Sequence, residues 1–342
     1  KMKSVPFLTR DILEEIESIK LHYNQYFLKE NPLTIKEVYK EFLIDFAYNT
    51  TSMEGNTITL KETEKLLQEN LTPKNRTLRE IYDLQNTEKV FFEILDSNKQ
   101  ITHDFIIWIH DNLMENIDNR KGYRIGESRV ARARFKSTPV KYVKADMGIL
   151  LKWYKKNKKK IHPLALASIF HQKFERIHPF SDGNGRTGRV FNIHYLTAKN
   201  LLDYPVLFLS RYILDHKNDY YSCLQGVSQR GRWKEWILFM LRAVEQTSTL
   251  TFNKINEIVS AKDSILNHVK SEGRFLNPEN LIEFIFTEPF TKVNHLVNSG
   301  IYAEKTARKY LNDLCEMQVL EKKVLEGKHY YLNIELYRIL SD

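Results

Sequence analysis

The chain has little of what marks several large protein classes. Only two of its 342 residues are cysteines, Cys223 and Cys315, and their separation fits neither a disulfide framework nor a metal-ligand spacing. We interpret both as small buried hydrophobic residues. No apolar run reaches the roughly 18 residues that a membrane-spanning helix needs, and the N-terminus has no apolar segment typical of a signal peptide. We therefore expect no membrane association and a cytoplasmic location.

Glycine is also scarce, at 12 residues, while amphipathic stretches at helical spacing recur along the chain. These two features predict a mainly α protein. One helix is expected to end at Gly55–Asn56, and Thr59 with Glu62 predicts a capping box that begins the next helix. Residues 127–139 place β-branched and aromatic residues around a basic middle, which favours a hairpin or an extended flap.

Charge gives only a general indication of the partners. The chain has 52 lysines and arginines against 43 acidic residues, a net charge of +9. This balance favours phosphate-bearing partners such as nucleotides or nucleic acid without choosing between them. The run "KKNKKK" at Lys155–Lys160 is interpreted as a solvated helix end.

The last part of the chain is predicted to form a separate module. Composition changes near residues 271–277, and three short helical patterns then precede two β-like runs separated by Gly327. That order is typical of a winged helix, a small α+β domain. We predict four parts: an N-terminal helical region (1–100), a helical core (101–250), a connecting helix or linker (251–274) and a winged-helix-like domain (275–342).

The third helix of this module allows two interpretations. Winged helices commonly place this helix in a DNA groove, and here it contains Lys305, Arg308 and Lys309. Neighbouring acids, among them Glu304 and Asp313, make the face only weakly basic. DNA binding stays open, but we favour a protein contact or a structural role.

The stretch "HPFSDGNGRTGR", His178–Arg189, concentrates polar chemistry in twelve residues. A glycine turn that leads into a helix N-terminus exposes unpaired N–H groups and so makes an anion cradle. Gly183 and Gly185 let the backbone approach a phosphate, Asn184 adds a donor, and Arg186 and Arg189 each can bind phosphate oxygens through two N–H groups. The lysine that follows the second glycine in common phosphate-binding loops is absent.

Two further side chains of this stretch suggest a reaction. Asp182 beside a phosphate would require a cation between them, as in many Mg²⁺ sites. An imidazole ordinarily titrates near neutral pH, so we expect His178 to take a proton from an attacking hydroxyl. The stretch therefore provides for a nucleotide, a metal and a general base together.

The stretch resembles the signature of the Fic family, His-Pro-Phe-x-(Asp/Glu)-Gly-Asn-Gly-Arg-x-x-Arg, at every specified position. The resemblance implies a Fic-type helical bundle with a β-hairpin flap that pairs with the target. It also implies an adenylyltransferase that moves AMP from ATP to a Ser, Thr or Tyr hydroxyl of an unidentified target protein. His178 would be the base and Asp182 would hold Mg²⁺, with Mn²⁺ as an alternative. The nucleotide would be bound by Gly183, Asn184, Gly185, Arg186, Thr187, Gly188, Arg189 and Tyr220.

A second pattern gains meaning from the same resemblance. "TTSMEGN" is similar to the inhibitory motif (Ser/Thr)-x-x-x-Glu-(Gly/Asn), with Thr50, Glu54 and Gly55 at the specified places. By resemblance, Glu54 would pair with Arg189 and deprive the γ-phosphate of its partner. The resemblance thus makes region 1–100 an N-terminal helical region with an inhibitory helix and region 101–250 the Fic catalytic core. The implied protein is a resting enzyme that becomes active when Glu54 is removed or displaced.

Other functions stay open at this stage. The base is not read from the motif, so UMP transfer is an alternative, as is removal of AMP from a modified protein. A different class of function is a winged-helix DNA-binding regulator or a nucleotide sensor. A homodimer is an open alternative for the oligomeric state.

Overall fold

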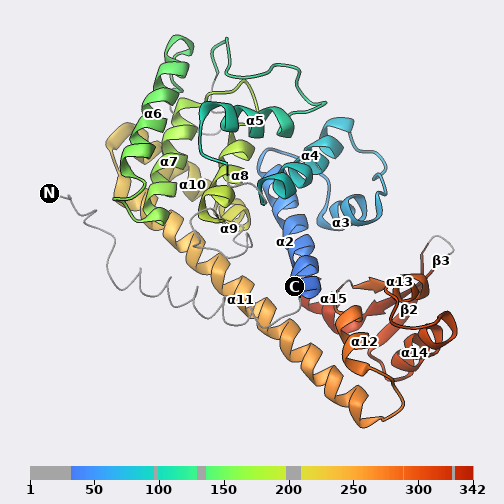
Figure 1. Cartoon of the computed structure of the whole chain (residues 1–342). Helices are drawn as coiled ribbons and strands as arrows, with labels where there is room; N and C mark the ends of the chain where they lie inside the picture. The colour runs from blue at the N-terminus through green and yellow to red at the C-terminus, as the bar shows by residue number, and fades with distance from the viewer. Residues whose placement is uncertain are drawn as a thin grey trace. The chain divides into compact units, whose positions relative to one another are not determined.

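The computed structural model describes residues 32–95, 99–128, 136–197, 209–287, 289–325 and 328–341. Most of the predicted flap, residues 129–135, lies outside the described residues. The described chain forms two compact units (Figure 1). The first contains residues 42–248, and the second contains residues 249–341 together with residues 32–41.

The first unit is helical throughout its described part. Its elements are α2 (Pro32–Met53, from residue 42 on), α3 (Leu60–Glu69), α4 (Leu78–Leu95), α5 (His103–Leu113), the short 3₁₀ helix η1 (Val140–Tyr142), α6 (Val143–Asn157), α7 (Pro163–Ile177), α8 (Asn184–Thr197), α9 (Leu209–Asp215), α10 (Lys217–Arg230) and the first part of α11 (Trp233–Ser271).

Local sequence explains where several of these helices begin and end. Helix α2 ends at Met53, and Gly55 then turns the chain at a φ of +100°, which a residue without a Cβ adopts readily. Thr59 and Glu62 form the predicted capping box at the start of α3. Pro163 occupies the first turn of α7, where its missing N–H costs no hydrogen bond. The two boundaries predicted from the sequence, at Gly55 and at Thr59, are confirmed.

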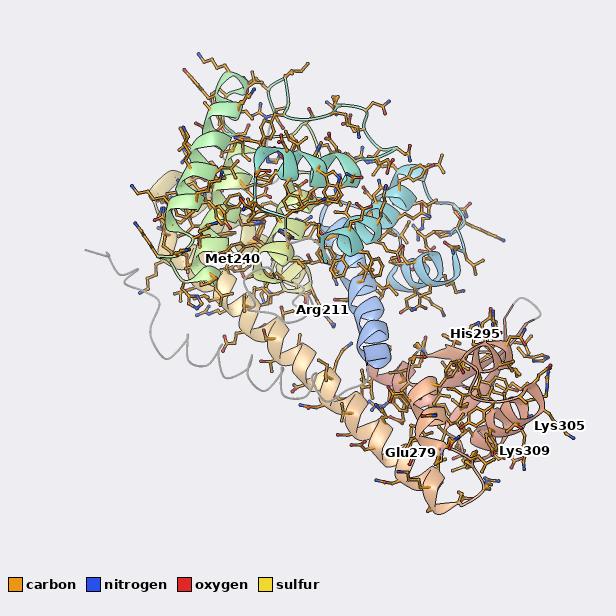
Figure 2. All side chains as sticks on the ribbon, viewed as in Figure 1. Arg211, Met240, Glu279, His295, Lys305 and Lys309 are labelled. Carbon is orange, nitrogen blue, oxygen red and sulfur yellow. The ribbon has the colours of Figure 1, made fainter. Side chains whose placement is uncertain are left out.

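Helices α7 and α8 lie in the middle of the first unit. They pack on each other, and α5 and α6 pack against them (Figure 1). The buried core includes Phe170, Tyr195, Trp236 and Met240, the last of which is labelled on α11 in Figure 2. The Trp236 indole N–H donates to the Ser168 carbonyl at 2.8 Å, so this large ring is buried without an unsatisfied donor. The core therefore fixes the C-terminal end of α7 and the N-terminal end of α8, which flank the motif.

The second unit contains the predicted three helices and hairpin in the predicted order. Its elements after α11 are α12 (Pro278–Ile285), β1 (Phe290–Thr291), α13 (Val293–Asn298), α14 (Glu304–Glu316), β2 (Leu320–Leu325), β3 (Lys328–Asn333) and α15 (Ile334–Ser341). The strands form an antiparallel sheet in the order β1-β3-β2, so β1 and α15 are additions to the prediction. Lys305 and Lys309 lie on α14 (Figure 2).

The units divide the chain differently from the four predicted parts. The predicted regions 1–100 and 101–250 contribute to one unit, whose described part ends at Ser248. The predicted connector 251–274 is mostly the continuous second part of α11. None of the described helices is long and apolar enough to cross a membrane.

Candidate active site

The motif folds as a tight loop between α7 and α8. Helix α7 ends because Pro179 has no N–H to continue it, and His178 takes a left-handed φ of +52° as the helix cap. Gly183 also has a positive φ, +74°, immediately before α8 begins at Asn184. The Asn184 amide donates to the Phe180 carbonyl and accepts from the Phe180 N–H, both at 2.9 Å. Asn184 therefore closes the loop, whereas the sequence suggested that it donates to an anion.

The His178 imidazole is largely buried beside this loop, with 14% of its side chain exposed. Burial disfavours the charged ring and lowers the pKa of His178 to about 4. Glu175 Oε2 lies 4.0 Å from His178 Nδ1, and burial raises the pKa of Glu175 to about 8. At pH 7 the imidazole is thus neutral, the state in which it can accept a proton.

The backbone of His178 is held by hydrogen bonds from Arg124, which lies in the segment that leads into the flap. Arg124 Nε donates to the His178 carbonyl at 2.8 Å, and the Arg124 N–H donates to the Pro179 carbonyl at 2.9 Å. The same guanidinium donates to the carbonyls of Gly126 and Thr138, on either side of the predicted flap. One buried arginine therefore ties both ends of that segment to the motif.

Asp182 presents a carboxylate at the other end of the loop, 37% exposed. One oxygen accepts from the Gly183 N–H at 2.6 Å, and the other pairs with Arg79 of α4. Burial opposes ionisation of this group, but Arg186 and Arg79 outweigh it, so the pKa of Asp182 is lowered. Asp182 is ionised at neutral pH and meets solvent.

The Arg186 guanidinium is held by carboxylates, whereas the sequence suggested that it binds phosphate oxygens. Its guanidinium, 1% exposed, forms an ion pair with Asp83 of α4 and lies 3.5 Å from Asp182 Oδ1. Arg186 therefore connects α8 to α4, and its positive charge stabilises the ionised Asp182 carboxylate.

Replacing Asp83 with alanine is expected to reduce the free energy of unfolding by about 3–5 kcal/mol, because it removes the buried partner of the Arg186 charge and leaves only Asp182, 3.5 Å away. Urea denaturation would measure the change. Asp263→Ala, at an exposed position of α11, is the matched control and should change stability by less than about 0.5 kcal/mol. Equal midpoints for the two variants would contradict the assigned role.

Arg189 makes the contact that the inhibitory pattern predicts. Its Nε donates to Thr50 Oγ1 at 2.7 Å, and one Nη donates to the Thr50 carbonyl at 2.9 Å and to Glu54 Oε1 at 2.6 Å. Burial raises the pKa of the Glu54 carboxyl, but the charge and hydrogen bond of Arg189 outweigh burial and the net pKa is lowered. The predicted pairing across 135 residues of sequence is present.

The Glu54 carboxylate also covers the start of α8. A Cβ built on Gly185 would collide with Glu54 Oε1 and lie 2.8 Å from an Arg189 Nη atom, so a larger residue here would displace these two side chains. The first N–H groups of a helix have no carbonyl partner and attract anions. Glu54 thus places a negative charge where the cradle would hold an anion.

Three of the predicted nucleotide-binding residues face the interior. Thr187 is fully buried and its hydroxyl donates to the Gly183 carbonyl at 2.8 Å. A Cβ on Gly188 would lie 2.9 Å from Glu175 Oε1. Tyr220 is 2% exposed, and its hydroxyl lies 2.8 Å from His171 Nε2. The structure gives these residues packing roles and does not bring Tyr220 to the loop surface.

Several residues that contribute to the site were not identified from the sequence. Arg79 and Asp83 lie on α4, and Arg124 precedes the flap. His110 of α5 stacks on Phe180 with ring centroids 3.7 Å apart, and its Nε2 lies 3.1 Å from the Asp182 carbonyl. The spacing of these residues along the sequence does not predict their contacts. The one partial signal is for Asp83, an acid on the otherwise apolar face of α4.

The helical arrangement and the motif between α7 and α8 are those of a Fic fold. Residues 100–196 match the Fic/DOC family, and residues 262–336 match the family described as "Protein adenylyltransferase SoFic-like, C-terminal domain". A solved Fic family protein from Desulfovibrio desulfuricans superimposes with a TM-score of 0.64 at 23% identity, covering 95% of this chain and 96% of the other. This chain is therefore a Fic/DOC domain protein with a SoFic-like C-terminal domain.

Curated relatives share a common description. The chain is 27% identical over 232 residues to protein adenylyltransferase Fic of Aedes aegypti, covering 65% of this chain and 44% of that protein. It is 26% identical over 269 residues to a probable protein adenylyltransferase of Aquifex aeolicus, covering 77% and 81%. Protein adenylyltransferase fic-1 of Caenorhabditis elegans is 23% identical over 281 residues, covering 80% and 52%. The chain thus spans about half the length of the two animal relatives.

Proposed function

We propose that this chain is a protein adenylyltransferase that transfers AMP from ATP to a hydroxyl of a target protein. The observation that carries the proposal is the folded motif, in which a neutral histidine and an ionised aspartate flank a helix N-terminus shaped by glycines. The shared name of the curated relatives supports the same activity. His178, Asp182 and the N–H groups at the start of α8 then have distinct roles.

His178 is the proposed base. Its neutral ring takes the proton of the target hydroxyl as the oxygen attacks the α-phosphate, and pyrophosphate leaves. Arg124 holds the His178 carbonyl, which limits where the ring can lie. The N–H groups at the start of α8 bind the phosphate oxygens, and negative charge that develops there is stabilised by the helix dipole.

Asp182 fits the role of a metal ligand. Its carboxylate is ionised and partly exposed, and it stands next to the proposed phosphate site. Among the residues that the structure describes, no three metal-binding side chains come together, so a cation here would rely on one carboxylate, phosphate oxygens and water, as Mg²⁺ commonly does. Bound Mg²⁺ would neutralise phosphate charge, and Arg79 would release the carboxylate oxygen that it now holds.

Autoinhibition is part of the proposal. Glu54 holds the guanidinium of Arg189 and covers Gly185, so the terminal phosphate of ATP would lose a cationic partner and meet a carboxylate. The negative charges of the Glu54 carboxylate and of the phosphate would repel each other. ATP would then bind in a pose unsuited to in-line attack.

Intact-protein mass spectrometry after incubation with Mg-ATP tests the activity. We expect an AMP adduct on the Glu54→Gly protein, from self-modification, and little or none on the parent chain. Parallel incubations with Mg-UTP and with Mn-ATP test the base and the metal. An adduct of UMP alone, or no adduct with any nucleotide, would contradict the proposal.

A further inference from the structure

The net positive charge of this protein is concentrated in one short segment. Residues 136–160 contain nine lysines and a single acid, Asp146, so this segment carries +8 of the chain's net charge of +9. The segment consists of η1, α6 and the turn that follows α6. The other residues of the chain nearly balance one another.

The lysines of α6 lie along one face. Lys144, Lys152, Lys155 and Lys156 are exposed and recur at helical spacing, and we call this set the lysine face of α6. The opposite side of the helix buries its apolar residues in the core, among them Val143, Met147, Leu150, Leu151 and Tyr154. At 1.5 Å per residue the lysine face extends over about 18 Å.

No acid neutralises this face within the part of the chain that the structure describes. None of the nine lysines forms an ion pair there, whereas Lys89, Lys262, Lys270 and Lys323 each pair with a glutamate. Asp146 accepts a hydrogen bond from Thr138 Oγ1 at 3.0 Å. A solvated helix surface usually mixes the two signs, so the absence of glutamate is notable. The helix dipole accounts for lysines in the last turn but not for Lys144.

The lysine face begins next to the active site. Thr138, whose carbonyl is held by Arg124, is bonded to Asp146 in the first turn of α6, and Arg124 also holds His178. Helix α6 then packs on α7 (Figure 1), and His178 caps the C-terminal end of α7. A polymer bound along the lysine face would therefore have one end near the segment that Arg124 ties to the proposed base.

We propose that the lysine face of α6 is the docking surface for the protein target, and that the target binds it through an acidic segment. The choice of protein over nucleic acid rests on the proposed function, which requires a protein hydroxyl at His178. Charge complementarity along about 18 Å would raise the local concentration of the target and orient it toward the loop.

Binding can be measured apart from catalysis by fluorescence anisotropy. The probes are a fluorescein-labelled oligoglutamate peptide, an oligoglutamine peptide of the same length and a single-stranded oligodeoxynucleotide of the same charge as the first. The test variant changes Lys144, Lys152, Lys155 and Lys156 to glutamine. The control variant makes the same change at four exposed lysines elsewhere on the first unit, Lys61, Lys65, Lys74 and Lys234.

We expect the oligoglutamate peptide to bind, the oligoglutamine peptide not to bind, and the test variant to bind the acidic peptide about tenfold more weakly than the control variant. Added salt should weaken the binding further. Equal losses in the two variants, or no binding at low salt, would overturn the proposal. Tighter binding of the oligonucleotide than of the peptide would also overturn it, in favour of a nucleic-acid partner.

Self-modification separates this proposal from the proposed function. Both quadruple variants in the Glu54→Gly background should still gain AMP, because the changed lysines lie outside the loop. Loss of peptide binding with self-modification intact supports docking at the lysine face. If no variant gains AMP, the proposed function is contradicted. The peptide-binding measurements then decide separately whether the lysine face binds an acidic segment.

Discussion

Replacing Glu54 with glycine is expected to raise the rate of AMP transfer by about 10- to 150-fold. The Glu54–Arg189 contact is a charge-assisted hydrogen bond of 2.6 Å, a class of interaction that contributes about 1.5–3 kcal/mol. Its removal frees the guanidinium for the terminal phosphate of ATP, and the stated free energy corresponds to that range of rates. Glycine is acceptable at this position because α2 has already ended at Met53.

The initial rate of AMP incorporation from labelled ATP measures the effect. Glu272→Gly is the matched control, since it also removes a glutamate that pairs with an arginine just after a helix, in the second unit. Adding Arg189→Ala to Glu54→Gly should cancel the gain, because the released arginine is the group that acts. A double variant as fast as Glu54→Gly would show that Glu54 inhibits by filling the cradle and not by holding Arg189.

The turns and the motif were predictable from the sequence because their causes are local. Pro179 ends α7 wherever α7 lies, and a glycine at Gly183 permits the positive φ that starts α8. The capping box of Thr59 and Glu62 depends on four consecutive residues. Such features need no knowledge of the tertiary structure.

The roles of the two motif arginines were not predictable in the same way. Arg186 and Arg189 are three residues apart on one helix, which suggested a shared ligand. In the structure Arg186 meets Asp83 of α4, and Arg189 meets Thr50 and Glu54 of the α2 end. Tertiary packing of α4 and α2 decides these partners. The Glu54 pairing was anticipated only through the family resemblance.

Asn184 illustrates why a residue type does not determine its role. An amide in a glycine-rich turn can donate to a phosphate or satisfy the turn itself. The buried backbone of Phe180 needs both a donor and an acceptor, and the amide of Asn184 supplies both at 2.9 Å. The Asn184 amide therefore bonds to the Phe180 backbone, whereas the sequence suggested that it would bond to the ligand.

Replacing His178 with alanine in the Glu54→Gly background is expected to lower the rate of AMP transfer by about 100- to 10,000-fold, the usual contribution of a general base. Binding of ATP should change little, because the N–H groups of α8 and Arg189 remain. The same AMP-incorporation assay measures the rate, and equilibrium binding of a nonhydrolysable ATP analogue measures the affinity. His268→Ala, at an exposed position of α11, is the control and should transfer AMP normally.

The pH dependence of the Glu54→Gly enzyme gives an independent test of the base. A base acts in its deprotonated form, so activity is lost as the pH falls through its pKa. Burial lowers the pKa of His178 to about 4, and the removal of Glu54 takes away a negative charge that raises it. Asp182 also keeps its charge at low pH because its pKa is lowered. We therefore expect kcat/KM to stay constant between pH 8 and about pH 5, because its pH dependence reflects the pKa values of the free enzyme.

An acid limb centred near pH 6.5, the pKa of a solvated imidazole, would contradict this expectation. It would mean that His178 is more open to water in the active enzyme than in the structure. The His178→Ala variant should have no acid limb at all from this residue. If that variant kept the limb of the parent, another group would have to be the base, and His178 would serve only to cap α7 and shape the loop.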